Sequence, residues 1–299
     1  MLKIGQKRRS CMDTSREFYM FVSPWFIGFL LFTLIPMLYS IYASFSDWNG
    51  MSSPVLIGIE NYVKMFTRDR KFTQSLKCTF YYACCTVPLN MMLSIILAVL
   101  LNMHLPGTTF YRSLYYLPCV ISGVAVYMVW MYLLRNTGYI NVLLNVFGIT
   151  GPDWLNDRAW AMPGLIIMNT STCGSQILIL LAGLQDIPTA YYEAAMIDGA
   201  GEVQQFFKIT VPLLTRVIFF NLITSVIGAL QMFGQAFTMT KGGPANSTYV
   251  YALYIYDKAF RYFDLGYACA LAVVLFGITL ILGLIILGTS RSWVHSEEA

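Results

Sequence analysis

Residues 265–290 read LGYACALAVVLFGITLILGLIILGTS, a run that contains no Asp, Glu, Lys or Arg. An α-helix needs roughly 20 apolar residues to cross a hydrocarbon core about 30 Å thick. This run exceeds that length, and a helix satisfies all of its backbone polar groups within itself. The sequence therefore predicts that this part of the chain crosses a membrane as a helix.

Uncharged runs of similar length recur along the whole chain. They occupy residues 18–46, 78–103, 113–134, 159–185 and 217–240. The composition agrees, because 57% of the residues are hydrophobic and only 11% are charged, against roughly 25% charged in a soluble domain. A β-barrel would show short segments of strict alternation, which LILLAG at 178–183 lacks. We therefore expect an all-α, polytopic membrane protein with about six transmembrane helices.

These runs predict one transmembrane domain over residues 1–299. We divide it into an N-terminal segment at 1–17, a long loop at 186–216 and a tail at 291–299. The basic N-terminal segment precedes an apolar run that is too long for a cleaved signal, so we expect an uncleaved anchor. Lys and Arg are nearly balanced between the two predicted sides, so the positive-inside rule selects neither orientation. A short turn at 105–107 and an interfacial helix at 139–149 complete the expected elements.

Several chemistries lack the residues they require. The sequence has no G-x-x-x-x-G-K-[ST] phosphate loop, so the chain itself is expected neither to bind ATP in that manner nor to be an enzyme. It holds two histidines and seven cysteines without a C-x-x-C pair, which favours buried thiols over a metal site. The basic residues are scattered and form no stripe for nucleic acid.

The loop between the fourth and fifth runs has the pattern of two short helices. Pro188 suits a helix start, and residues 191–197 are rich in alanine. Asp198-Gly199 is a turn dipeptide, a second helix fits 202–209, and Pro212 ends it. Two interpretations fit these features: a compact docking surface, or an amphipathic linker lying on lipid.

The residues of this loop favour docking, because the segment 188–212 resembles the EAA loop of binding-protein-dependent ABC permeases. The strongly typed positions that match are Glu193, Ala194, Ala195, Asp198, Gly199, Ala200, Phe206, Ile209 and Pro212. One position departs from the family pattern, since Thr215-Arg216 stands where a second proline often follows. The resemblance extends along the chain through the stretches at 23–48, 58–62, 240–248 and 264–268, which are similar to those of maltose-type and glycerol-phosphate-type permeases.

This resemblance implies a type I importer fold in a bacterial cytoplasmic membrane, with the loop and both termini in the cytoplasm. It implies a carbohydrate substrate, most readily a di- or oligosaccharide, and several partners. These are a second homologous permease, a pair of ATPase subunits that hold ATP and Mg, a sugar-binding protein outside, and membrane lipid. Within the loop, Glu193 is expected to make an ionic contact with the ATPase and Gly199 to provide the turn.

Polar and aromatic residues of the later spans are the candidates for a substrate pathway. They are Asn169, Thr172, Gln176, Asn221, Thr224, Gln231, Phe233, Gln235 and Tyr267. Amides and hydroxyls match a sugar, and the absence of Lys and Arg from the runs favours a neutral one. The same residue types also hold membrane helices together, and the partner permease is an alternative location for the site.

Three other functions compete with the importer interpretation. An ion-coupled transporter usually places charged residues within the membrane, and the six runs have none. A membrane enzyme needs a nucleophile, an acid–base pair or a metal cluster. A scaffold gives no reason for a complete EAA loop. The sequence leaves open which sugar is carried and which ATPase and binding protein take part.

Overall fold

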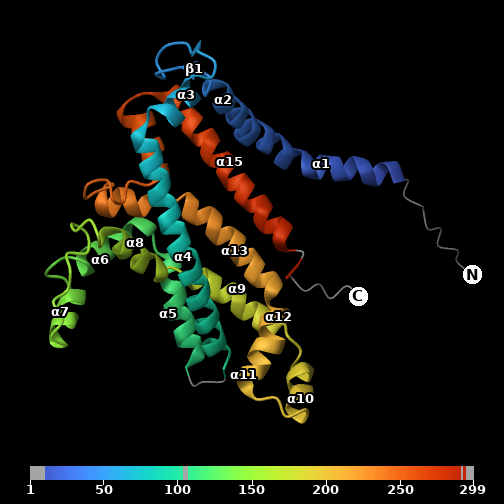
Figure 1. The fold of residues 1–299 in the computed structure, drawn as a ribbon. Coiled ribbons are helices and arrows are strands. Elements are labelled where there is room, and N and C mark those ends of the chain that lie inside the picture. The colour runs from blue at the N-terminus through green and yellow to red at the C-terminus, as the bar shows by residue number, and fades with distance from the viewer. Residues whose placement is uncertain (1–10, 104–106, 291, 294–299) are drawn as a thin grey trace, which may run out of the picture. The chain divides into compact units, whose positions relative to one another are not determined.

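The computed structural model describes residues 11–103, 107–290 and 292–293, with side chains from Phe18 onward. Nearly all of its regular structure is helical, which confirms the predicted fold class; the two strands found among the described residues have two residues each. Figure 1 shows the elements by label. Residues 105 and 106 of the predicted turn and much of the segments 1–17 and 291–299 lie outside the described residues. Gly107, the last residue of that turn, has φ +84°.

Membrane-length helices occur where the uncharged runs predicted them, but only three of them are continuous. These cover Phe18–Ala43, Arg70–Asn102 and Leu265–Ser290. Three further candidates are pairs of helices bent at a short break: Thr108–Val120 with Gly123–Leu133 by 103°, Ala161–Thr170 with Gly174–Gln185 by 41°, and Glu202–Leu213 with Thr215–Leu230 by 65°. The six expected spans are therefore present as candidates, of which half are broken.

The fifth expected span differs from the structure in its bounds. The uncharged run ends at residue 240, but the helix α13 (Thr215–Leu230) ends ten residues earlier. Gln231 has φ −96° and ψ 11°, outside the helical region, and a short π-helix, η3 (Ala236–Thr240), follows. The absence of charged residues therefore indicated which segment is apolar, but it did not indicate where the helix ends.

The described chain divides into two compact units. Unit 1 is formed by residues 1–64 and 258–273, and unit 2 by residues 65–257 and 274–299. Three of the described helices run across the division, namely α3 (Glu60–Thr67), the π-helix η4 (Asp257–Arg261) and α15 (Leu265–Ser290). The expectation of one transmembrane domain over the whole chain stays a prediction.

Unit 1 contains α1 (Cys11–Phe29), the π-helix η1 (Leu30–Leu34) and α2 (Ile35–Ala43), followed by the strands β1 (Ser46–Asp47) and β2 (Val55–Leu56). The π-turn lies directly before Pro36, whose ring removes a backbone donor and locally disturbs helical pairing. The strands pair antiparallel. Asn61 ties α3 to them, donating from Nδ2 to the carbonyls of Ser44 and Ser46 at 3.0 Å each.

A second connection in unit 1 joins the strands to the start of α15, where the Gly266 amide donates to the Trp48 carbonyl at 3.0 Å. Beside it, Asp264 Oδ2 lies 3.7 Å from Nζ of both Lys64 and Lys258. Both ammonium groups also lie over the ring of Tyr267, 4.7 and 5.0 Å from its centroid. Cation–π contacts of this kind add to the attraction of the carboxylate, and the buried tyrosine is fixed between the two lysines.

Unit 2 is built around α4 (Arg70–Asn102), which contacts α8 (Ala161–Thr170), α9 (Gly174–Gln185), α13 and α14 (Tyr251–Tyr256). One face of α4 carries buried polar residues at intervals of three and four: Ser75, Thr79, Tyr82, Thr86, Asn90 and Ser94. Residues at this spacing share one face of a helix. The face continues into Ala98 and Leu101, which belong to an apolar cluster with Ile177, Leu180, Leu184 and Leu214.

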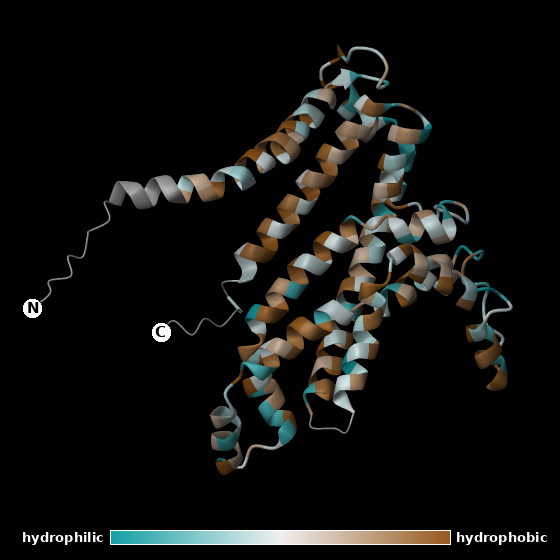
Figure 2. Cartoon of the chain, turned by 180° about the vertical axis from the view of Figure 1, so that it is seen from behind, coloured by the Kyte–Doolittle hydropathy of each residue, from teal (hydrophilic) through white to brown (hydrophobic). Residues whose placement is uncertain are grey.

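Unit 2 also contains the following elements. They are α5 (Thr108–Val120), α6 (Gly123–Leu133), α7 (Tyr139–Val146), α10 (Thr189–Ile197), α11 (Glu202–Gln205), the π-helix η2 (Phe206–Thr210) and α12 (Val211–Leu213). The π-helix η4 (Asp257–Arg261) begins at the last residue of the unit's first segment. The short α7 occupies the site of the expected interfacial helix. Figure 2 shows hydrophobic colour over most of α15 and a mixed surface on the loop that carries α10 and α11.

Candidate functional site

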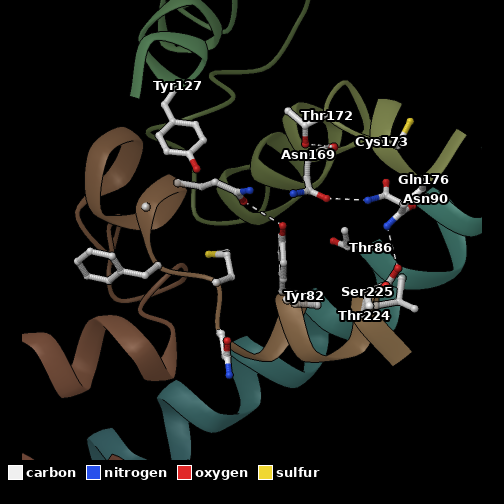
Figure 3. A pocket seen from close by; sticks show the side chains of 18 residues that line it. Tyr82, Thr86, Asn90, Tyr127, Asn169, Thr172, Cys173, Gln176, Thr224 and Ser225 are labelled. Atoms are coloured by element: carbon white, nitrogen blue, oxygen red, sulfur yellow. Dashed lines mark hydrogen bonds between the residues drawn. The ribbon is translucent and has the colours of Figure 1, made fainter. Parts of the chain in front are cut away.

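A cavity of about 390 Å³ lies within unit 2 and is lined by side chains from α4, α6, α8, α9 and α13 and from the segment after α13. Its size falls within the range of about 300–1,000 Å³ that is usual for ligand pockets. Figure 3 shows Tyr82, Tyr127, Asn169 and Gln176 around it. Among the described residues that line the cavity, none is Asp, Glu, Lys or Arg. Its lining therefore offers amides, hydroxyls and aromatic faces.

Most of the candidate pathway residues meet at this cavity. Those that line it are Asn169, Thr172, Gln176, Thr224, Gln231, Phe233 and Gln235. Two candidates lie elsewhere. Asn221 does not line the cavity and is buried at 1% exposure, although it lies one turn of α13 before the cavity-lining Thr224 and Ser225. Tyr267 is fixed between the lysines of unit 1, so its ring is not a free surface for a sugar.

The sequence argument missed the contribution of α4. Tyr82, Thr86 and Asn90 line the cavity from this helix, and Tyr127 lines it from α6. The signal was present as polar residues spaced four apart within the otherwise apolar run 78–103. Such spacing places side chains on one helix face, but only packing shows whether that face meets a cavity or another helix.

Several polar groups of the lining are occupied in holding helices together. The Tyr82 hydroxyl donates to Gln235 Oε1 at 2.9 Å, and Asn90 Nδ2 donates to Asn169 Oδ1 at 2.7 Å. Gln176 bridges three helices, since its Oε1 accepts from Ser94 of α4 at 3.2 Å and its Nε2 donates to Ser225 of α13 at 2.8 Å. These bonds use both ends of the Gln176 amide.

Other groups at the cavity retain hydrogen-bonding capacity. Asn90 Oδ1 is buried and has no hydrogen-bond partner among the described residues, and the amide of Gln231 is exposed. A buried unpaired acceptor costs about 1–3 kcal/mol, which a ligand hydroxyl would recover by donating to it. Asn90 Oδ1 is therefore an unused acceptor beneath the cavity wall, whereas the exposed amide of Gln231 is directly accessible to a ligand.

An aromatic wall adjoins these polar groups. Phe233 stacks on Phe237, with ring centroids 5.2 Å apart and planes 22° apart, and also contacts the ring of Tyr256 at 5.2 Å. Sugar rings combine hydroxyl edges with apolar faces. A flat, half-buried ring beside amides provides both kinds of contact, so the cavity has the chemistry of a carbohydrate site.

The loop between α9 and α13 forms the second candidate site. It contains the expected pair of short helices, α10 and α11, and continues into the π-turn η2. Gly199 has φ +81° and provides the reversal between them, a conformation that glycine adopts without steric cost. Gln205 Nε2 closes the turn by donating to the Ala200 carbonyl at 2.9 Å. The two short helices and the turn between them are confirmed, and α10 and α11 lie at one end of unit 2 (Figure 1). The expected helix end at Pro212 is wrong, because the helical stretch Glu202–Leu213 runs through this proline and bends only after Leu213.

The named loop residues divide into an outer and an inner set. Glu193, Ala194, Asp198 and Gly199 are exposed, whereas Ala195, Ala200, Phe206, Ile209 and Pro212 are half-buried. The sequence argument had also missed four exposed apolar side chains, namely Met196 at 59%, Ile197 at 87%, Val203 at 73% and Phe207 at 65% exposure. The loop therefore presents an outer apolar surface next to the carboxylate of Glu193, while Phe206 and Ile209 face inward.

Comparison with known proteins places these two sites in a family context. Residues 90–294 match the model for the binding-protein-dependent transport system inner membrane component. The chain is 44% identical to the probable ABC transporter permease protein YesP of Bacillus subtilis strain 168, over 98% of this chain and 96% of that protein. It is 36% identical to the lactose transport system permease protein LacF of Rhizobium radiobacter, over 86% of this chain and 88% of that one.

A solved structure has the same fold. It is that of a bacterial ABC transporter involved in the import of the acidic polysaccharide alginate, with a TM-score of 0.82 and 24% identity, covering 95% of this chain and 99% of the other. At this identity the likeness concerns the fold.

Proposed function

Since the chain belongs to the family of binding-protein-dependent transport system inner membrane components and is a membrane permease of the ABC sugar-transporter type, we propose that it forms half of the translocation pathway of an importer. In this proposal the cavity of unit 2 receives the sugar, most readily a di- or oligosaccharide. The loop at 188–212 couples its movement to an ATPase subunit.

The observation that supports sugar recognition most directly is the uncharged lining of the cavity. Amide groups of Asn90 and Gln231 face it, and the Phe233 ring lies beside them. Hydroxyls are both donors and acceptors, so they match amides better than they match a charged group. An ion-coupled transporter would be expected to place a titratable side chain at such a position, and the described lining has none.

Coupling to an ATPase is supported by the outer surface of the loop. Ile197 is exposed at the end of α10, between two candidate spans, and Val203 and Phe207 are exposed in Glu202–Leu213, which a bend of 65° separates from α13. We place Glu202–Leu213 outside the bilayer together with α10. Apolar groups exposed outside the bilayer mark a partner surface, and Glu193 adds an ionic contact for a basic residue of that partner. Because the sequence lacks a phosphate loop of its own, ATP and Mg bind to the ATPase pair.

The remaining partners follow from the same assignment. None of the most apolar 18-residue window of the first span is buried inside this chain, so that span is available to lipid and to a second, homologous permease. A sugar-binding protein delivers the substrate on the outer side. Six spans place both termini on one side, which we assign to the cytoplasm of a bacterial cell together with the loop.

Recovery of the intact complex from its native host tests this proposal. A tagged chain is solubilised in mild detergent beside a Glu193→Ala variant, and the proteins that copurify are identified. We expect an ABC ATPase and a second permease with the wild type, and at least a severalfold smaller yield of ATPase with the variant. A chain that purifies without an ATPase, or whose yield of ATPase is indifferent to Glu193, contradicts the coupling assignment.

A further inference from the structure

The helix α10 is attached to the rest of unit 2 through few side chains. Of its nine residues, Thr189–Ile197, only Tyr192 and Ala195 are half-buried, and the others are exposed. These two residues are three positions apart and share one face of the helix. The attachment of α10 therefore depends on a narrow inner face.

Tyr192 makes a specific contact on this face. Its hydroxyl lies 2.9 Å from Oγ1 of Thr210, a hydrogen bond that spans 18 residues of sequence. Thr210 is buried at 6% exposure and is the last residue of η2, directly before α12 and α13. The bond therefore joins the middle of α10 to the base of the fifth candidate span.

A cavity of about 210 Å³ lies behind α10 and includes both partners of this bond in its lining. Its walls come from the ends of α4 and α9 and from α11 and η2: Val99, Asn102, Met103, Leu184, Tyr192, Glu202, Gln205, Phe206 and Thr210. Close packing against α4 and α9 would fix α10 by contact alone. Because a cavity takes the place of such packing, the position of α10 depends more on the hydrogen bond between Tyr192 and Thr210.

The covalent route between α10 and η2 is less suited to transmit movement. It runs through residues 198–201, which include Gly199 at φ +81° and Gly201. Glycine permits large changes of backbone angle at little cost. A displacement of α10 would be absorbed in this turn unless a second connection bypassed it.

We propose that Tyr192 is the positioning residue of the coupling step, and that its hydrogen bond to Thr210 makes α10 move as one body with η2 and α12, which lead into α13. This inference rests on the proposed function, in which the ATPase displaces α10. It specifies that the displacement reaches the spans through the start of α13, and it assigns the transfer to one hydroxyl pair.

The test uses the complete transporter reconstituted in proteoliposomes with its copurified partners. The measured quantity is the amount of sugar imported per ATP hydrolysed, for wild type, Tyr192→Phe, Thr210→Val, Thr210→Ser and the double variant Tyr192→Phe/Thr210→Val. Tyr116→Phe removes a hydroxyl from α5 and serves as the matched control. A single hydrogen bond contributes about 0.5–1.5 kcal/mol, so we expect the ratio to fall about two- to tenfold in Tyr192→Phe and Thr210→Val.

If Tyr192 acts as a positioning residue, the other variants should also give specific results. The double variant should be no worse than either single variant, because both remove the same bond. Thr210→Ser should keep the wild-type ratio, since it retains the hydroxyl. Recovery of the ATPase with Tyr192→Phe should equal that with Tyr116→Phe, because the lost bond lies on the inner face of α10 and not on its outer surface.

Two results would overturn the inference in distinguishable ways. A complex that assembles and imports sugar, but whose Tyr192→Phe variant keeps the wild-type ratio of sugar to ATP, refutes the role of Tyr192 alone. A wild-type chain that recovers no ATPase refutes the proposed function and this inference with it.

Discussion

Replacing Gln176 by leucine separates helix packing from sugar recognition. Gln176 joins α9 to Ser94 of α4 at 3.2 Å and to Ser225 of α13 at 2.8 Å. Side-chain hydrogen bonds between membrane helices contribute about 0.6 kcal/mol on average and up to about 1.7. Loss of both therefore costs about 1–3 kcal/mol. Ser94, at 0% exposure, would also lose its partner, which adds part of the cost of about 1–3 kcal/mol for a buried unpaired group.

We therefore expect Gln176→Leu to destabilise the chain by about 2 kcal/mol, roughly a 30-fold change in the equilibrium. Gln231→Leu is the matched variant, because Gln231 lines the same cavity but is exposed. It should leave stability unchanged and raise the KM for sugar about two- to tenfold, as expected for one lost hydrogen bond.

The assay compares the thermal midpoint of the purified complex in lipid nanodiscs with the KM for uptake into proteoliposomes. The reasoning predicts that Gln176→Leu lowers the midpoint well below that of Gln231→Leu. A Gln176→Leu complex as stable as wild type, with its defect confined to KM, would show that Gln176 contacts sugar and that its two bonds contribute little to packing.

Three further changes test other parts of the structure. Gly199 has φ +81°, and asparagine tolerates positive φ better than a β-branched residue. Gly199→Asn should therefore lower sugar uptake less than Gly199→Val, and equal uptake by the two variants would contradict the turn geometry. Asp264→Asn should reduce protease resistance of unit 1, since Lys64 and Lys258 would lose their shared carboxylate, and Asp264→Glu should restore part of it. Gly174→Ala should lower membrane yield at least severalfold, because an added Cβ would lie 2.1 Å from a backbone oxygen of α5; wild-type yield would show that this approach is looser.

The sequence predicted those features that depend on local chemistry. Uncharged length predicted where membrane helices occur, and Pro188 and Gly199 predicted the start of α10 and the turn after it, whereas Pro212 lies within a helix that it was expected to end. Both depend on properties of neighbouring residues, namely hydrophobic length and backbone freedom. Seven of the pathway candidates also meet at one cavity, because polar spacing on a helix is retained on folding.

Features that depend on packing were not predictable in this way. The break after Leu230 lies inside an uncharged run, and lack of charge carries no information on where a helix ends. Asn221 and Gln231 looked alike in sequence, yet one is buried at 1% exposure and the other is exposed at the cavity. The sequence made Tyr267 a candidate sugar-binding ring, but in the structure two lysines from different segments lie over that ring.

The central claim is that this chain carries sugar through a movement driven at the loop 188–212. Uptake of radiolabelled sugar into proteoliposomes containing the purified complex, sugar-binding protein and internal ATP tests it most directly, with wild type and Gly199→Val compared at equal ATPase content. The account predicts ATP-dependent uptake by the wild type and continued ATP hydrolysis with little uptake by Gly199→Val. Equal uptake by the two proteins, or wild-type uptake that persists without ATP, would contradict it.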